Sequence, residues 1–251
     1  MKFALLTGTS RGIGAALARE LCARGWTVTG CARGAAPDEL AKTEAYTHLS
    51  VDLADREAVR RTFVEPASDS PAFAALGRAE RAVVVHNAAV VATAATHAVE
   101  LDAAYDLCAL NVALPIWLSG WFLRAAPAES DVRVVEISSG AATSAYPGWP
   151  LYCASKAALR MAGEVLSVEA AEVDALRDRR LSVLSYAPGV VATGMQADIR
   201  GVDPALFPRR ERFVELHETG KLAQPEAPAK DLARRLEAPD PPAYEVARYQ
   251  A

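Results

Sequence analysis

The sequence predicts an α/β fold in which a doubly wound parallel sheet carries helices on both faces. Short apolar runs alternate with amphipathic segments along nearly the whole chain, and the first run leads into a glycine-rich turn. A third observation is the run RAVVVH at residues 81–86, which is typical of a strand buried on both faces. Alternating strands and helices imply right-handed crossovers and hence parallel strands. With 251 residues and 51% hydrophobic composition, we expect one domain spanning residues 1–251.

The apolar periodicity places the elements in chain order. Strands are predicted over residues 2–7, 27–32, 46–53, 81–86, 131–138 and 181–187. Helices are predicted over residues 13–24, 54–64, 98–126, 151–173 and 229–237. Gly25 is expected to stop the first helix, and Pro115 is expected to bend or break the long third one.

Prolines and mixed charge set residues 195–227 apart from this alternation. We expect a substrate flap in this segment, and an irregular surface loop is the alternative. Within it, Arg209, Arg210 and Arg212 are interleaved with acidic residues, which predicts a solvated helical face.

Composition argues against several kinds of partner. The net charge of -4 gives no electrostatic reason to expect nucleic acid. The N-terminal apolar run is short for a signal peptide, and no later segment offers about 18 consecutive apolar residues, so we expect no membrane segment and a cytoplasmic location. Cys22, Cys31, Cys108 and Cys153 lack C-x-x-C spacing, so we expect reduced, mostly buried thiols and no metal site.

The turn TGTSRGIG, residues 7–14, stands between the first strand and the first helix. Glycines in that position let backbone N–H groups approach a pyrophosphate at the positive end of a helix. The sequence therefore predicts a Rossmann-type dinucleotide site that includes Gly8, Gly12 and Gly14.

The tip of the second strand reads GCARG and lacks the acidic residue that grips the ribose in NAD sites. Arg33 stands there instead, and no carboxylate follows until Asp38. Arg11, inside the glycine turn, is a second guanidinium able to flank the 2′-phosphate of NADP. We expect a preference for NADPH; two ordinary surface arginines are the alternative.

Tyr152 and Lys156 are four residues apart, so they share one face of the predicted helix. A positive charge close by is expected to lower the phenol pKa from its usual value of about 10, which makes Tyr152 a usable general acid. Ser139, at the end of a strand, would stabilise charge on a carbonyl oxygen. A packing pair and a plain strand end are the structural alternatives, and we expect His86 to make a structural hydrogen bond.

Taken together, these motifs resemble the short-chain dehydrogenase/reductase family over nearly the whole chain. The matching segments are TGTSRGIG, VDL with Asp52, HNAA where the family has NNAG, Asn111, ISS with Ser139, Y-x-x-x-K, and PGVVAT with Thr193. GWPLYCASKAA, LSYAPG and Met195-Gln196 look like segments of the sepiapterin reductases and of bacterial relatives that reduce vicinal diketones.

The resemblance implies a catalytic set of Ser139, Tyr152, Lys156 and Asn111. Lys156 would also hold the nicotinamide ribose, and Asn111 would help to position a water beside it. It further implies a homodimer or homotetramer built on the long helices around Asn111 and Lys156. The implied cofactor contacts are Gly8, Ser10, Arg11, Gly12, Ile13, Gly14, Arg33, Asp52, Leu53, Asn87, Ala88, Ala89, Tyr152, Lys156, Pro188, Gly189, Val191 and Thr193.

The expected substrate pocket is apolar and suits a bulky or aromatic ketone. It comprises Ser139, Tyr146, Trp149, Tyr152 and Met195, with Leu206 and Phe207 of the flap as further candidates. Trp149 as a core residue or subunit contact is the alternative. Sepiapterin reductases hold the pterin with a C-terminal aspartate, whereas this tail has Glu245 and no aspartate after Asp240, which speaks against pterin specificity.

We therefore expect an NADPH-dependent carbonyl reductase for an apolar vicinal dicarbonyl or sepiapterin-like substrate. A 3-oxoacyl or general ketone reductase of the same family is the alternative enzyme. From another class, the chain could be an NADPH-sensing regulatory protein that has kept the fold and lost the chemistry. The complete Ser139, Tyr152, Lys156 and Asn111 set argues against such a sensor.

Overall fold

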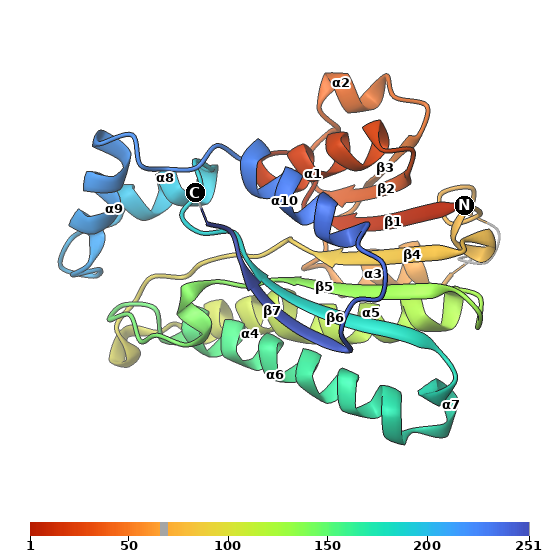
Figure 1. Cartoon of the computed structure of the whole chain (residues 1–251). Coiled ribbons are helices and arrows are strands. Elements are labelled where there is room, and N and C mark those ends of the chain that lie inside the picture. Colours follow the sequence, from red (N-terminus) through yellow and green to blue (C-terminus); the bar gives the residue numbers. More distant parts are fainter. Residues whose placement is uncertain (66–69, 251) are drawn as a thin grey trace.

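A seven-stranded parallel sheet forms the centre of the molecule (Figure 1). The computed structural model describes residues 1–65 and 70–250. The strand order is β3-β2-β1-β4-β5-β6-β7, so it reverses beside β1, where the chain crosses to β4. The strands are β1 (Lys2–Thr7), β2 (Thr27–Ala32), β3 (Tyr46–Ser50), β4 (Arg81–His86), β5 (Asp131–Ile137), β6 (Arg180–Ala187) and β7 (Tyr244–Arg248).

Helices cover both faces of this sheet, which confirms the doubly wound prediction (Figure 1). One face carries α1 (Gly12–Ala23) and α10 (Glu226–Leu236), and the other carries α3 (Arg56–Phe63), α4 (Leu101–Cys108), α5 (Leu114–Ala125) and α6 (Pro150–Glu172). The shorter helices are α2 (Asp38–Ala41), α7 (Asp174–Arg177), α8 (Gly194–Gly201) and α9 (Arg210–Glu218).

Two hydrophobic cores lie on the two faces of the sheet, and β4 contributes to both. Val84 belongs to the core under α3, α5 and α6, whereas Val83 and Val85 belong to the core under α1 and α10. All three valines are fully buried. Because successive strand residues point to opposite faces, a central strand covered on both sides must be apolar throughout, which explains RAVVVH.

Most predicted elements are present, with shifts at their ends. Gly25 ends α1 with a φ of 76°, as a left-handed stop requires. The third strand ends at Ser50, earlier than predicted, because Asp52 starts a turn in which its Oδ1 accepts a hydrogen bond from the backbone N–H of Ala54, 3.0 Å away. The long third helix divides into α4, a π-helical turn (Ala109–Ala113) and α5, with Pro115 in the first turn of α5.

The run Leu101–Ala125 is long and apolar enough to cross a membrane by length and composition alone. The run is interrupted by Asp102, Asp106 and Asn111, so it is not the unbroken stretch of about 18 apolar residues that the sequence analysis looked for. In this fold the run lies along the sheet and buries Leu107, Leu118 and Phe122. Its apolar character thus has an explanation in the core.

The free cysteines differ in exposure. Cys31 is buried and Cys22 and Cys153 are partly buried, but Cys108 is exposed, contrary to the expectation for it. Within residues 1–65 and 70–250 no group of three or more His, Cys, Asp or Glu side chains is placed to hold a metal ion.

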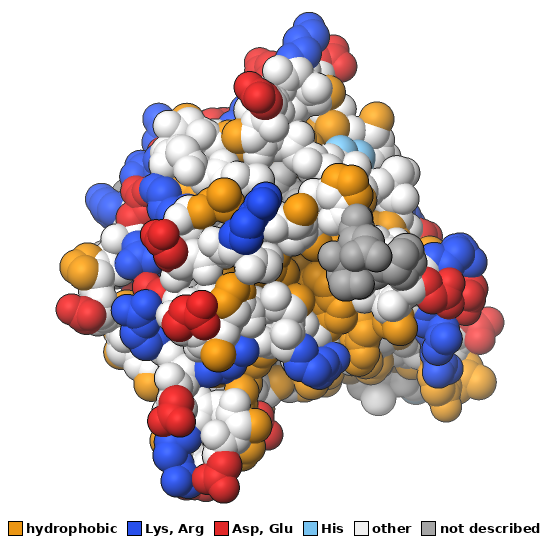
Figure 2. All heavy atoms as spheres, turned by 90° about the vertical axis from the view of Figure 1, so that its right-hand side faces the viewer, with side chains coloured by type: hydrophobic (Ala, Val, Ile, Leu, Met, Phe, Trp, Pro, Cys, Tyr) orange, Lys and Arg blue, Asp and Glu red, His pale blue; other side chains and the backbone are white. Residues whose placement is uncertain are grey.

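Positive and negative side chains are interspersed on the face at the amino ends of the strands (Figure 2). Ion pairs formed here include the N-terminal amine with Glu80 at 3.1 Å and Arg81 with Asp131 at 3.0 Å. Both signs of charge thus share this face, as expected of a chain whose net charge is only -4.

The C-terminal strand β7 was not predicted. Its Glu245 carboxylate accepts hydrogen bonds from Arg133 of β5 at 2.7 Å and from Arg235 of α10 at 2.8 Å. Arg133 is almost completely buried, and burial lowers its pKa. Glu245 thus joins the edge strand β7 to β5 and α10. It is not one of the residues that line the cleft described below.

We predict that Glu245→Ala lowers the free energy of unfolding by about 3 kcal/mol, because it leaves the buried Arg133 guanidinium without its carboxylate. Urea denaturation measures the change. Glu215→Ala, at an exposed site on α9, is the control and should stay within about 0.5 kcal/mol of the native protein. Unchanged stability of Glu245→Ala would show that the pair contributes little.

Candidate active site

A cleft of about 740 Å³ opens at the carboxyl ends of the strands. It runs from the glycine turn, past the ends of β4 and β5, to α8 and α9. Ligands of open α/β sheets bind at this edge, where the strand order reverses.

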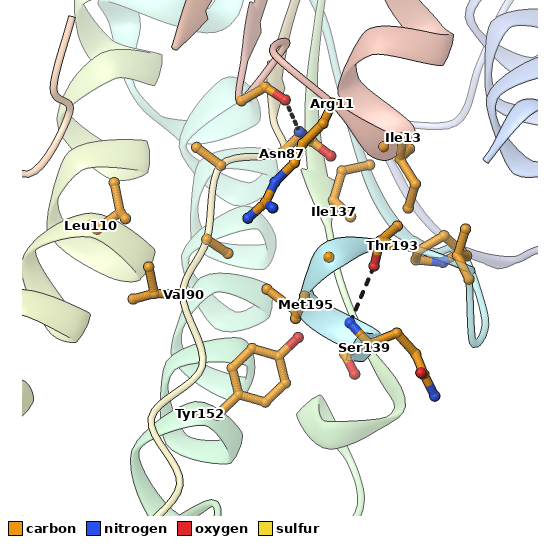
Figure 3. Close-up of a pocket in the computed structure, with 18 of the residues that line it drawn as sticks. Arg11, Ile13, Asn87, Val90, Leu110, Ile137, Ser139, Tyr152, Thr193 and Met195 are labelled. Atoms are coloured by element: carbon orange, nitrogen blue, oxygen red, sulfur yellow. Dashed lines mark hydrogen bonds between the residues drawn. The ribbon is translucent and has the colours of Figure 1, made fainter. Parts of the chain in front are cut away.

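The glycine turn is tightly packed, and its glycines have no side chains, so a ligand could approach its backbone closely. Gly8 and Gly12 have φ values of 76° and 60°, in the region that favours glycine. A Cβ on Gly14 would lie 2.2 Å from the Gly8 carbonyl oxygen and 2.6 Å from Asn87 Nδ2. Asn87 Nδ2 donates hydrogen bonds to the carbonyls of Thr7 (2.9 Å) and Gly8 (3.0 Å), which ties β4 to the turn (Figure 3). The turn and the α1 N-terminus therefore fit a pyrophosphate.

Nearly all residues expected to contact the cofactor line this cleft. Gly14 is the exception, because it lies beneath the turn and supports it. The lining residues among those predicted are Gly8, Ser10, Arg11, Gly12, Ile13, Arg33, Asp52, Leu53, Asn87, Ala88, Ala89, Tyr152, Lys156, Pro188, Gly189, Val191 and Thr193.

The tip of β2 is supported by side chains that the sequence analysis missed. The Tyr46 hydroxyl lies 2.9 Å from Thr9 Oγ1 and 3.0 Å from His48 Nδ1. His48 Nε2 in turn donates to the Gly34 carbonyl at 2.8 Å, next to Arg33. These contacts join the glycine turn to the loop that presents Arg33.

The two expected phosphate-binding arginines lie differently in the cleft. Arg33 is exposed at the tip of β2. The Arg11 guanidinium lies against Gly194 at the start of α8, where a Cβ would be 2.4 Å from Nη1, and it points into the middle of the cleft (Figure 3).

Tyr152 and Ser139 face the same space at the far end of the cleft, with Met195 across from them (Figure 3). Tyr152 is 8% exposed, and burial raises its pKa to about 12, although the Ser139 hydroxyl partly opposes this. The expected lowering of the Tyr152 pKa is therefore wrong for this state of the protein, because burial disfavours the charged phenolate.

Lys156 is buried one helical turn beyond Tyr152. Its Nζ donates a hydrogen bond to the Ile137 carbonyl at 2.8 Å and lies 5.7 Å from the centre of the Tyr152 ring. Burial lowers the pKa of this lysine. A positive charge on Lys156 is therefore close enough to act on Tyr152, and whether the lysine carries that charge depends on the groups buried around it.

Asn111 lies in the π-helical turn and is almost completely buried. Its Oδ1 accepts from the Val90 N–H at 3.0 Å, and its Nδ2 donates to the Val90 carbonyl at 2.9 Å and to Ser155 Oγ at 3.2 Å. The side chain therefore holds the loop after β4 against α6. The expected part of Asn111 in positioning a water stays a prediction. Asn111 does not itself line the cleft.

His86 has the structural role that was expected. Its Nε2 lies 2.8 Å from Ser119 Oγ on α5, and burial together with the charge of Lys156 lowers its pKa to about 3. It is therefore a neutral imidazole near pH 7.

The substrate end has an aromatic wall. Trp149 stacks on Phe207 with ring centres 4.4 Å apart, contacts Tyr146 and Tyr152, and donates from Nε1 to Thr93 Oγ1 at 3.1 Å. Tyr146, Trp149 and Met195 line the cleft as predicted.

Two predicted pocket residues do not reach it. Leu206 is 45% exposed, and Phe207 is fully buried behind Trp149 as its support. Pocket residues that the sequence analysis missed are Phe213 and Arg212 of α9 and Arg248 at the end of β7.

Residues 195–227 include most of α8 and all of α9, joined by turns, and the predicted flap stays a prediction. Backbone hydrogen bonds close the base of the segment, from Ala192 to Ala223 at 2.9 Å and from Ala223 to Val190 at 3.1 Å. The face around Arg209 is also more than a solvated one, because Arg209 lies 4.9 Å above the Tyr146 ring and Arg212 lines the cleft.

The doubly wound sheet, the glycine turn and the Ser139–Tyr152–Lys156 end of the cleft define a dinucleotide-dependent oxidoreductase fold and site. Residues 2–202 match the family described as short chain dehydrogenase. The chain belongs to this family, whose members use a nicotinamide cofactor and act on carbonyl or alcohol groups.

Several known proteins resemble the whole chain. A benzil reductase ((S)-benzoin forming) of Bacillus cereus is 31% identical over 99% of both chains. A sepiapterin reductase of Xenopus laevis is 32% identical over 93% of this chain and 90% of its own. The solved structure of the angucycline C-6 ketoreductase LanV with bound NADP superposes with a TM-score of 0.77, at 26% identity over 98% of this chain and 93% of its own. These relatives confirm the predicted family and branch.

We predict that Gly14→Ala weakens binding of the nicotinamide cofactor about tenfold or more, because the new methyl group collides with Gly8 and Asn87 and distorts the turn. Titration of the fluorescence of the reduced cofactor measures the affinity. Gly77→Ala, away from the cleft, is the control, since its Cβ would meet nothing within 4 Å. Equal affinities of the two variants would contradict the close-approach argument.

Proposed function

We propose that the protein is an NADPH-dependent carbonyl reductase for apolar vicinal dicarbonyl compounds. The observation that carries the proposal is the position of Tyr152 and Ser139 between the cofactor half of the cleft and the aromatic wall at Trp149. A bound carbonyl there would have a proton donor on one side and an apolar surface on the other.

The chain's own residues would handle the proton and the developing charge. The nicotinamide, when bound, supplies the hydride. Ser139 would donate a hydrogen bond to the carbonyl oxygen, and Tyr152 would transfer its proton to that oxygen. A high Tyr152 pKa keeps the phenol protonated in the free protein, which suits an acid in the direction of reduction. Once the proton has left, the positive charge of Lys156 would stabilise the tyrosinate.

The aromatic wall supports a bulky, apolar substrate. Tyr146, Trp149 and Phe213 offer ring surfaces in the cleft, and the Bacillus cereus relative is a benzil reductase. Pterin recognition has less support, because Glu245, the acid of the tail, is engaged by Arg133 and Arg235.

The preference for NADPH is supported by Arg33 and by the lack of a carboxylate at the tip of β2. The LanV neighbour was solved with NADP. We extend this cofactor to the present chain as part of the proposal.

We also propose self-association through α4, α5 and α6. Large apolar side chains on these helices are strongly exposed in the single chain, among them Leu101, Tyr105, Ile116, Met161 and Val168. A second copy packed on this face would cover them, as an apolar exposed patch favours.

Oxidation of NADPH over a panel of carbonyls tests the proposed function. We expect benzil-like diketones to be reduced with a higher kcat/KM than sepiapterin, simple ketones or acyl thioesters. Tyr152→Phe should bind NADPH normally and lose about 10²-fold or more in kcat, because it lacks the transferable proton. Preference for acyl thioesters would instead favour the 3-oxoacyl reductase reading, and tight NADPH binding without turnover would favour the sensor.

We predict that Arg33→Ala lowers kcat/KM for NADPH about 10- to 100-fold and leaves the value for NADH nearly unchanged, because a charge-assisted contact to the 2′-phosphate is lost. Arg78→Ala, at an exposed site away from the cleft, is the control. An equal loss with both cofactors would count against a role at the phosphate.

A further inference from the structure

A row of buried polar side chains crosses the sheet beneath the active site. His86 of β4, Glu136 of β5 and Ser185 of β6 are paired in register, so they lie side by side on the face that α5 and α6 cover. Each is at most 3% exposed. The mechanism proposed above uses none of them.

The Glu136 carboxylate packs directly against the backbone of α6 at Gly163. A Cβ at residue 163 would lie 2.7 Å from Oε1 and 2.9 Å from Oε2. Oε2 has no hydrogen-bond partner among the described residues. A glycine in the middle of a long helix weakens the helix, and a buried carboxylate is unfavourable, so the two features together indicate a specific use for this carboxylate.

Lys156 lies seven residues before Gly163 on α6, which places it two turns away on the same side of the helix. Its Nζ donates to the carbonyl of Ile137, the residue that follows Glu136. Burial lowers the pKa of Lys156 and raises the pKa of Glu136, and the charge of each opposes the shift of the other.

The other titratable groups around Glu136 do not replace Lys156 as its counter-charge. His86 is neutral near pH 7, as described above. Glu164 of α6 is itself acidic and pairs with Arg160 at 3.3 Å. The Tyr244 hydroxyl of β7 donates to the Arg160 carbonyl.

We propose that Glu136 is a positioning residue whose buried carboxylate keeps the Lys156 ammonium charged beside Tyr152. The inference rests on the proposed function, because it explains how that site retains its cation. Lys156 lines the cleft beside Tyr152, whereas Glu136 acts only through Lys156.

The sign of the effect follows from the charges. The negative charge of Glu136 raises the pKa of Lys156, so removing the carboxylate lets the lysine lose its proton at a lower pH. Above that pH the tyrosinate that forms during reduction has no cation next to it. Turnover should therefore fall first at alkaline pH and stay near the native level below it.

The direct test is the titration of Lys156 itself, read by NMR from the ¹³C-labelled ε-carbons of the lysines. The chain's lysines are Lys2, Lys42, Lys156, Lys221 and Lys230, and a Lys156→Arg spectrum assigns the resonance of interest. We expect Glu136→Gln to move its midpoint to lower pH by about one unit or more, a tenfold change in proton affinity. The matched control is Glu164→Gln, which should leave the midpoint in place. An unchanged midpoint in Glu136→Gln overturns the proposal.

The pH profile of kcat gives an independent readout. In Glu136→Gln the alkaline limb should move to lower pH by the same amount, with little change in KM for NADPH. A uniform loss of kcat at every pH, together with a lower melting temperature, would mean a purely structural role and would also overturn it. If the native protein reduces no carbonyl of the panel, the proposed function fails, while the lysine titration still decides the charge coupling.

Discussion

The hydrogen bond from Lys156 Nζ to the Ile137 carbonyl is the contact on which the active-site geometry depends. It joins α6 to the end of β5, two elements that carry the two halves of the chemistry. Tyr152 stands one turn before this bond on the helix, and Ser139 stands two residues after it along the chain. Since both ends of the bond are buried, water does not compete with it, and the two hydroxyls face the same space.

Burial that fixes this geometry also alters the acid–base properties of the site. Four buried groups show this effect, namely Tyr152, Lys156, His86 and Glu136. Burial shifts the pKa of each in the direction that favours its neutral form. A lysine held this way stays cationic only if the protein supplies compensation. The row under the sheet offers one negative group for that purpose, and Gly163 is the residue that lets it come close.

What could be predicted from the sequence depended on how local the signal was. RAVVVH, the turn after β1 and the Tyr152–Lys156 spacing each carry their meaning within about ten residues, and the structure places all three as expected. β7 was missed because its five residues mix charged and apolar side chains in too short a run, and its place depends on pairing with β6. Glu136 was missed for a similar reason, since its importance appears only when α6 packs Gly163 and Lys156 over it. The Tyr152 pKa was predicted wrongly because spacing reveals a neighbouring charge but not the depth of burial.

The aromatic wall shows the same dependence on packing and bears on substrate choice. Trp149 is fixed from behind by Phe207, from below by Tyr152 and at its indole nitrogen by Thr93, so its ring is a rigid surface and not an adaptable one. α8 and α9 complete the pocket, and Phe207, which lies between them, is the residue that stacks on Trp149, so this segment is packed against the wall. The aromatic wall and the segment that carries α8 and α9 thus form one packed cluster beside the cleft, which favours apolar substrates. Selectivity among such substrates should then be set by Met195, Arg212 and Phe213, which line the cleft from this segment, while Ser139 and Tyr152 keep the chemistry the same.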